Sequence, residues 1–170
     1  MADVLMIIDM QNGVCRNTQP VANLNQVVSG IKKRIEVYRS QNKPILFVQH
    51  NDEDLVKNSY NWQIIDDFKV LSSDIMIQKT HANSFYHTNL QDVLTKHKSR
   101  SIEICGAQVE FCVDTTIKMA HGLGYCLEMV RDLTTTTSNQ IMSAQQTINF
   151  YQDHIWNHRF LKFIELNSKD

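Results

Sequence analysis

Three side chains with complementary chemistry stand at, or shortly after, apolar segments that lie far apart in the chain: Asp9, Lys79 and Cys112. A thiolate is a strong nucleophile, and a nearby ammonium or a helix N-terminus lowers the pKa of the thiol that forms it. A carboxylate can take the thiol proton and later return it to a leaving amine. The three residues together predict covalent catalysis by a cysteine, without a histidine as the base.

Each residue also has a structural explanation when it is considered alone. Asp9 could cap a turn, Lys79 could be a solvated surface lysine, and Cys112 could be a small core residue. Packing alone gives no reason for three complementary groups to follow separate apolar segments in this way. Their shared placement therefore favours a functional site.

Apolar segments alternate with amphipathic ones along the whole chain, which is the pattern of an α/β protein. Continuous apolar runs indicate buried strands, and apolar residues at steps of three and four indicate helices. We expect strands at residues 4–9, 43–50, 74–79, 101–105, 125–130 and 160–166. We expect helices at residues 21–41, 89–97 and 112–121, and a last one with Ile141, Ala144, Ile148, Tyr151 and Ile155 on one stripe.

This alternation predicts a three-layer α/β/α architecture with a mostly parallel, Rossmann-like central sheet, formed by a single domain over residues 1–170. In such sheets ligands bind beyond the carboxyl ends of the strands. Functional residues should therefore lie at or just after strand ends. Asp9 and Lys79 end their predicted strands, and Cys112 opens the helix that follows the fourth strand.

Several local expectations follow from turn and capping residues. Gly106 should end the fourth strand, Thr134–Thr137 should form a turn, and Thr137 with Gln140 should form a capping box. Residues 51–73 should be a polar excursion with a short helix near "WQIIDDF" at 62–68.

Composition excludes several classes of protein. Apolar residues make up 42% of the chain and charged residues 21%, and the formal net charge is −1. No basic footprint for nucleic acid is visible, and no apolar stretch approaches the roughly 20 residues of a membrane span. The N-terminus lacks the features of a signal peptide, and the four cysteines have no paired spacing, so we expect a cytoplasmic protein with reduced thiols.

Three motifs, in this order, resemble those of the isochorismatase-like cysteine hydrolases, which include nicotinamidases, N-carbamoylsarcosine amidohydrolases and ureidoacrylate amidohydrolases. The resemblance implies that Asp9 is the base, Lys79 the catalytic lysine and Cys112 the nucleophile. The motifs are "LMIIDMQNG" at residues 5–13, "IQKTHANSFYHTNL" at 77–90 and "ICGAQVEFCVDTT" at 104–116.

The resemblance also implies a cis peptide bond between Ala107 and Gln108, and an oxyanion hole formed by the backbone N–H groups of Gln108 and Cys112. Val109 stands where the family often has a threonine. Family members that act as isochorismatases lack the cysteine and cleave a vinyl ether. The presence of Cys112 therefore favours hydrolysis of an amide-like C–N bond.

Nicotinamidases carry a metal site after the second strand, with an aspartate followed two residues later by a histidine. Here His50 and Asp52 stand in the reverse order, without clearly matching further ligands. They are weak metal candidates, and no cofactor is expected. We expect His50 instead to donate a hydrogen bond to a substrate.

Gln11, Trp62 and Phe85 are further candidates for substrate binding at the rim. Gln11 could line the pocket, hold Asp9 in place, or only hydrogen-bond within its turn. The two aromatic residues could wall the pocket or anchor their loops.

The sequence thus predicts a hydrolase that cleaves a small amide, carbamoyl or ureido substrate through an acyl group on Cys112. Two alternatives remain open: a nicotinamidase proper, assisted by a metal, and a non-catalytic ligand-binding or redox-sensing protein on the same scaffold. The resemblance implies a homodimer or homotetramer, with a small molecule as the other partner.

Overall fold

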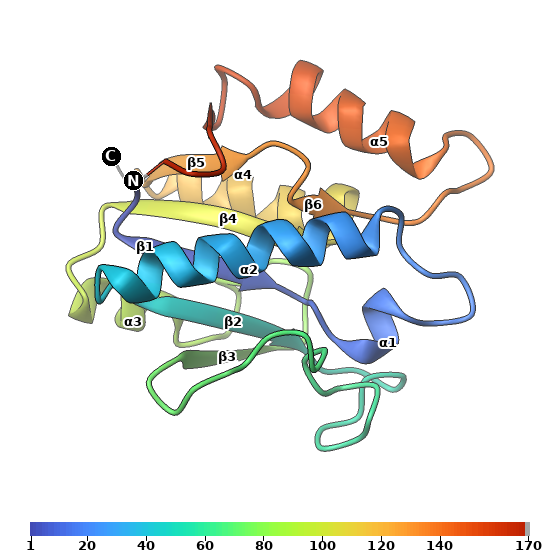
Figure 1. The fold of residues 1–170 in the computed structure, drawn as a ribbon, viewed down its shortest axis with the longest axis horizontal. Helices are drawn as coiled ribbons and strands as arrows, with labels where there is room; N and C mark the ends of the chain where they lie inside the picture. The colour runs from blue at the N-terminus through green and yellow to red at the C-terminus, as the bar shows by residue number, and fades with distance from the viewer. Residues whose placement is uncertain (169–170) are drawn as a thin grey trace.

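A seven-stranded parallel sheet forms the centre of the computed structural model, which describes residues 1–168 (Figure 1). The spatial order is β3-β2-β1-β4-β5-β7, and the short β6 pairs with β4. The strands are β1 (Val4–Ile8), β2 (Ile45–His50), β3 (Ile75–Lys79), β4 (Ser101–Ala107), β5 (Cys126–Val130), β6 (Thr134–Thr135) and β7 (Lys162–Ile164).

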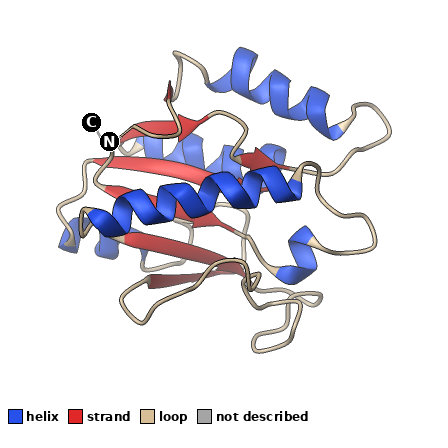
Figure 2. Cartoon of the chain, in the orientation of Figure 1, coloured by secondary structure: helices blue, strands red, loops and turns tan. Residues whose placement is uncertain are grey.

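Helices cover both faces of this sheet, which confirms the predicted three-layer architecture (Figure 2). Helix α2 crosses one face, and α3 and α4 lie behind the other face (Figure 1). The helical segments are α1 (Asn12–Cys15), α2 (Leu24–Ser40), α3 (Leu90–Lys96), η1 (Val109–Val113), α4 (Asp114–Gly122), α5 (Ala144–Phe150) and η2 (Tyr151–Trp156), of which η1 and η2 have π-helical hydrogen bonding.

Strand β1 shows why the central strands are continuously apolar. Met6 and Ile8 join the core cluster that contains residues of α3, α4 and α5. Leu5 and Ile7 join the cluster that contains the apolar stripe of α2. Because successive side chains point to opposite faces, a strand covered on both faces must be apolar at every position.

Gly106 does not end the fourth strand, as expected from the sequence, but continues it. Its φ is +119°, and a Cβ built there would lie 2.1 Å from the carbonyl oxygen of Ile8. The glycine therefore permits β4 to approach β1 closely, where any side chain would collide with backbone.

The expected turn at residues 134–137 is also partly wrong, because Thr134 and Thr135 pair with β4 as the short strand β6. The predicted capping box at Thr137 is wrong as well. The box forms at Ser143, whose side chain accepts from the backbone N–H of Gln146 while the Gln146 side chain accepts from the N–H of Ser143. Ile141, expected on the stripe of this helix, precedes it and is 90% exposed.

Residues 51–73 contain turns but no helix, contrary to the prediction for 62–68. The segment instead pairs with the turn that follows β1, because Ile64 forms an isolated bridge with Gln11. The helix after β4 begins earlier than predicted, with the π-helical turn η1 from Val109.

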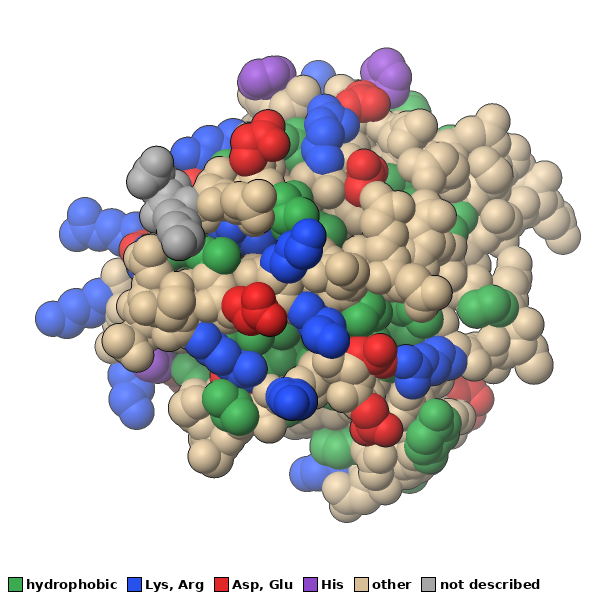
Figure 3. Space-filling view, viewed as in Figure 1, with side chains coloured by type: hydrophobic (Ala, Val, Ile, Leu, Met, Phe, Trp, Pro, Cys, Tyr) green, Lys and Arg blue, Asp and Glu red, His purple; other side chains and the backbone are tan. Residues whose placement is uncertain are grey.

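Within residues 1–168, no helix has the length and hydropathy needed to cross a membrane. Acidic and basic side chains are interspersed on the face seen in Figure 3, over and around α2. This face therefore has no continuous patch of one charge.

Candidate active site

The site lies at the carboxyl edge of the sheet. Strands β2 and β4 lie on opposite sides of β1 there, so the strand order changes direction beside β1. His50 ends β2 and Lys79 ends β3, and the two residues are register partners. Asp9 follows β1, with φ at +49°. Cys112 lies in η1, after β4. Parallel strands present their carboxyl ends at one edge, and so the topology gathers these four residues.

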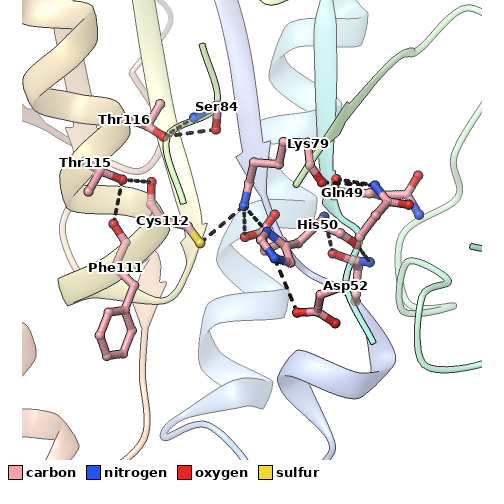
Figure 4. Close-up of polar contacts among 12 residues, drawn as sticks. Gln49, His50, Asp52, Lys79, Ser84, Phe111, Cys112, Thr115 and Thr116 are labelled. Atoms are coloured by element: carbon pink, nitrogen blue, oxygen red, sulfur yellow. Dashed lines mark hydrogen bonds and ion pairs between the residues drawn. The ribbon is translucent and has the colours of Figure 1, made fainter. Parts of the chain in front are cut away.

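The ammonium of Lys79 is the centre of the cluster (Figure 4). Its Nζ lies 2.7 Å from Oδ2 of Asp9, 2.9 Å from Nδ1 of His50 and 3.2 Å from Sγ of Cys112. Lys79 and Asp9 are 1% and 2% exposed, and so this is a buried ion pair. The structure thus brings together the carboxylate, ammonium and thiol that the sequence singled out.

Burial raises the pKa of the Asp9 carboxyl, and the positive charge of Lys79 opposes that shift. Burial and then the negative charge of Asp9 raise the pKa of the Cys112 thiol to about 12, although Lys79 acts in the other direction. The expectation of a lowered thiol pKa is therefore wrong. Sequence alone showed the favourable ammonium but could not show that desolvation outweighs it.

These shifts mean that the resting thiol keeps its proton, with an acceptor close by. Oδ1 of Asp9 is buried and has no hydrogen-bond partner among the residues that the structure describes. Moving the proton from Cys112 to Asp9 moves the negative charge from oxygen to sulfur, and Lys79 contacts both atoms. The ammonium can therefore neutralise either anion, and the two acids titrate as a coupled pair.

The segment before the thiol is shaped by a cis peptide bond between Ala107 and Gln108. The carbonyl oxygen of Gln108 accepts from the backbone N–H groups of Phe111 and Val113, each at 3.2 Å. The N–H of Gln108 makes no hydrogen bond to any residue in the described part of the chain. This arrangement presents an unused backbone donor next to the turn that carries Cys112.

The two ring nitrogens of His50 have different partners, one in the buried cluster and one in the loop after β2. Nδ1 faces Lys79, and Nε2 lies 3.3 Å from Oδ2 of Asp52. Burial and the charge of Lys79 lower the pKa of the imidazole. The lowered pKa favours the neutral ring, and Nδ1 can accept from the ammonium only in the tautomer that carries its proton on Nε2.

The predicted metal candidates His50 and Asp52 contact each other, with Nε2 and Oδ2 3.3 Å apart. Among the described residues, the donor atoms that lie within 4.8 Å of one another belong to Asp9, His50 and Cys112, without Asp52. All three of those residues already contact the Lys79 ammonium. The Lys79 ammonium therefore lies where these three donor residues converge.

Gln11 is fully buried and holds backbone rather than lining an open pocket. Its Nε2 donates to the carbonyl oxygens of His50 and Trp62, at 3.0 and 2.8 Å, and its Oε1 accepts from the N–H of His50 at 2.8 Å. Trp62 donates its indole N–H to Asn51. Phe85 packs on the core and against the ring of Tyr125. Their roles in substrate binding stay predictions, and each has a structural contact of its own.

A network of amide side chains, which was not predicted from the sequence, supports the end of β2. Gln78 donates to Gln49 at 2.8 Å, and Asn51 donates to Gln78 at 3.0 Å. The available signal was the occurrence of amide residues next to both His50 and Lys79, at the ends of two strands that pair.

A polar cavity of about 370 Å³ lies beside the site and shares Gln108 and Asp52 with it. Its other lining residues come from α1 and the segment after it, from the loop after β2, and from Thr137, and they include Asn17, Asn61 and Asp54. The volume and polarity suit a small hydrophilic molecule.

The Isochorismatase domain family matches residues 3–152 of the chain. A relative described as an uncharacterized isochorismatase family protein, YddQ of Bacillus subtilis, is 27% identical over 147 residues, which cover 83% of this chain and 82% of the relative. Nicotinamidase 3 of Arabidopsis thaliana is 24% identical over 157 residues, 82% of this chain and 76% of that protein.

Solved structures agree with the fold. A crystal structure described as an isochorismatase family protein has a TM-score of 0.92 and 44% identity, covering 95% of this chain and 97% of the other. N-carbamoylsarcosine amidase from Thermoplasma acidophilum has a TM-score of 0.82 and 18% identity, covering 99% of this chain and 98% of the other. The second likeness concerns the fold alone.

Proposed function

The chain belongs to the isochorismatase family, and on that premise we propose that it is a cysteine hydrolase that cleaves the C–N bond of a small amide, carbamoyl or ureido compound. The observation that carries the proposal is the position of the Lys79 ammonium, which contacts both the Asp9 carboxylate and the Cys112 sulfur. A nucleophile, a proton acceptor and a compensating cation thereby lie together in one cluster.

In the first half of the reaction, Sγ of Cys112 attacks the substrate carbonyl as its proton moves to Asp9. The carbonyl π electrons move to oxygen and form a tetrahedral oxyanion. When the oxyanion collapses, the C–N bond breaks and Asp9 returns the proton to the leaving nitrogen. Ammonia or an amine departs, and a thioester remains on Cys112.

In the second half, water attacks the thioester while Asp9 accepts one of its protons. The C–S bond breaks, the carboxylic or carbamic acid leaves, and the proton returns from Asp9 to the sulfur. Asp9 thus acts alternately as base and acid, and the enzyme ends in its starting protonation state. Lys79 stays charged throughout and compensates the anion on oxygen or on sulfur.

The oxyanion needs donors that are not engaged elsewhere. The N–H of Gln108, which makes no hydrogen bond within residues 1–168, supplies one in this proposal. The backbone N–H of Cys112 supplies the second. Donors fixed in a site that excludes water stabilise a developing charge strongly because they need no reorientation during the reaction.

The choice of a C–N bond is supported by Cys112 itself and by the relative named as a nicotinamidase. The polar cavity beside Gln108 supports a small substrate with hydrogen-bonding groups. A metal-assisted nicotinamidase is the less supported alternative, because His50 and Asp52 contact each other and belong to no common cluster of three donor residues in the described chain.

The test is ammonia release from a panel of small amides, carbamoyl compounds and ureides, with nicotinamide included. Each compound is assayed with and without zinc, iron or manganese, using the wild type and Cys112→Ala. We expect turnover of at least one compound that needs Cys112 and no added metal. Turnover by Cys112→Ala at the wild-type rate would refute the proposal. Cysteine oxidation without turnover of any amide would favour the redox-sensing alternative.

A cytoplasmic location and assembly as a homodimer or homotetramer are part of the same proposal. The four cysteines of the chain are free in the structure, as is usual for proteins of a reducing compartment. Light scattering of the purified protein measures the assembly directly, and a monomer would contradict that part of the proposal.

A further inference from the structure

We infer that His50 is a positioning residue: as the neutral tautomer with its proton on Nε2, it accepts one of the three ammonium protons of Lys79 and so directs the other two at Asp9 and Cys112. The part that Lys79 plays in hydrolysis rests on the proposed function. The hydrogen-bond arrangement itself does not.

The Lys79 ammonium has as many N–H donors as it has polar neighbours. An ammonium group has three N–H donors and no acceptor. Nζ of Lys79 has neighbours at hydrogen-bond distance in Asp9, His50 and Cys112, at 2.7, 2.9 and 3.2 Å. Each proton therefore has one acceptor, provided that Nδ1 of His50 carries a lone pair. A proton on Nδ1 would place two donors against each other.

The other ring nitrogen is arranged to keep this tautomer. Nε2 lies 3.3 Å from Oδ2 of Asp52, a carboxylate that can only accept when ionised. Oδ1 of Asp52 is itself fixed by the backbone N–H groups of Asp54 and Leu55, at 2.9 and 2.7 Å. A histidine tautomer is set by the partner of its second nitrogen. Here that partner is the Asp52 carboxylate, which two backbone N–H groups fix in place.

The backbone of His50 is held as firmly as its ring. Gln11, fully buried, accepts from the N–H of His50 and donates to its carbonyl oxygen. The register of β2 and β3 sets His50 beside Lys79. The buried Gln11 thus fixes the end of β2 that carries the imidazole.

The charges around the ring agree with a neutral imidazole. Burial and Lys79 lower the pKa of His50, His81 lowers it further, and Asp9 and Asp52 act in the opposite direction. The net shift is downward. Protonation would also add a second cation against the ammonium and remove its third acceptor.

His50 does not have the geometry of the base for Cys112. Nδ1 of His50 and Sγ of Cys112 each contact Nζ of Lys79, and among the described residues no hydrogen bond joins the imidazole to the sulfur (Figure 4). Its effect on the thiol therefore passes through Lys79. Without the imidazole, the ammonium has a proton lacking an acceptor and can turn away from the sulfur.

The first test reads the tautomer in the intact wild-type protein. Long-range ¹H–¹⁵N spectra of ¹⁵N-histidine-labelled protein distinguish a protonated Nε2 from a protonated Nδ1. We expect His50 to show a proton on Nε2 alone between pH 6 and pH 8, assigned by its loss in His50→Asn. A proton on Nδ1, or a charged ring at pH 7, would overturn the inference.

The second test separates the acceptor from the side-chain volume. His50→Leu removes the acceptor, whereas the amide oxygen of His50→Asn can take the place of Nδ1. The alkylation rate of Cys112 by iodoacetamide is measured in a Cys126→Ser background, because Cys126 is the exposed cysteine. We expect a decrease of about tenfold to hundredfold in His50→Leu, in proportion to a lost hydrogen bond to a charged group. His50→Asn should stay within about threefold of wild type on the same scale.

The matched control is His97→Leu, which removes an exposed imidazole at the end of α3. It should leave the Cys112 alkylation rate unchanged. Equal rates in wild type and His50→Leu would overturn the inference. Should no amide be hydrolysed while the tautomer and the alkylation series come out as expected, the proposed function fails and the role of His50 stands.

Discussion

The ammonium of Lys79 lies 3.2 Å from the sulfur of Cys112, although the two residues are 33 positions apart in the chain. The same ammonium lies 2.7 Å from Asp9, which comes from a third segment. One cation thus serves two groups that exchange a proton in the proposed reaction. In the proposed reaction the nucleophile therefore rests as a thiol, because burial and Asp9 raise its pKa to about 12.

Replacement of Cys112 by serine should abolish hydrolysis, with a decrease of about a thousandfold or more, because a hydroxyl is far less acidic and less nucleophilic than a thiol. The side chain is nearly isosteric and only partly buried. Unfolding in urea should therefore show a stability within about 1 kcal/mol of wild type. Loss of activity together with loss of fold would not support the assignment, and retained activity would refute it.

Asp9→Asn should separate the two functions of the carboxylate. Hydrolysis should be lost with the base, but the pKa of the Cys112 thiol should fall, because a negative charge that raises it is gone while Lys79 remains. The midpoint of the pH profile for Cys112 alkylation, measured with Cys126→Ser, should move to lower pH.

The exposed Asp92→Asn is the control for that experiment, since it changes charge equally in α3. It should alter neither the rate of hydrolysis nor the midpoint of the pH profile for Cys112 alkylation. A midpoint that is unchanged or higher in Asp9→Asn would mean that Asp9 does not act on the sulfur.

Lys79→Met should leave Asp9 buried without its cation and destabilise the protein at pH 7 by about 3–5 kcal/mol. Burial already raises the pKa of Asp9, and the lost ammonium was the largest opposing influence. The folded variant then binds more protons than the unfolded chain above the unfolded pKa of Asp9, and so its stability decreases as pH rises.

Urea unfolding at pH 5 and pH 8 measures this dependence. The exposed Lys96→Met serves as the control and should follow the wild type at both pH values. Equal stability of Lys79→Met at the two pH values would show that Asp9 is not the group that requires the ammonium.

A second buried ion pair, away from the site, should be important for stability alone. Arg34 and Glu103 are joined by two hydrogen bonds of 2.7 Å, and the hydroxyl of Tyr38 donates to Glu103 at 2.9 Å. Arg34→Met should cost about 3–5 kcal/mol, because it leaves a buried carboxylate unpaired. Arg34→Met with Glu103→Met should recover most of that loss in urea unfolding. A double variant less stable than the single one would contradict this account.

The arrangement of strands could be predicted from the sequence because burial on both faces leaves a clear apolar signal. The same parallel topology made the convergence of Asp9, Lys79 and Cys112 predictable, since residues after parallel strands meet at one edge. These inferences depend on pattern and connectivity, and both are present in a single sequence.

The features that escaped prediction depend on distances between segments. Nothing in the local pattern shows that β1 passes so close to Gly106 that no Cβ fits, and so the sequence wrongly predicts a strand end there. The contact of His50 with Lys79 depends on the register of β2 and β3. The raised pKa of Cys112 depends on how deeply η1 buries the sulfur.

The most direct test of the central claim is the mass of the intact protein during turnover of a substrate found in the amide panel. Rapid acid quenching should show a transient increase equal to the acyl or carbamoyl group, located by peptide mapping on Cys112. The adduct should form and decay at rates consistent with turnover, and it should be absent in Cys112→Ser. Turnover without any adduct, together with full activity of Cys112→Ala, would contradict the account.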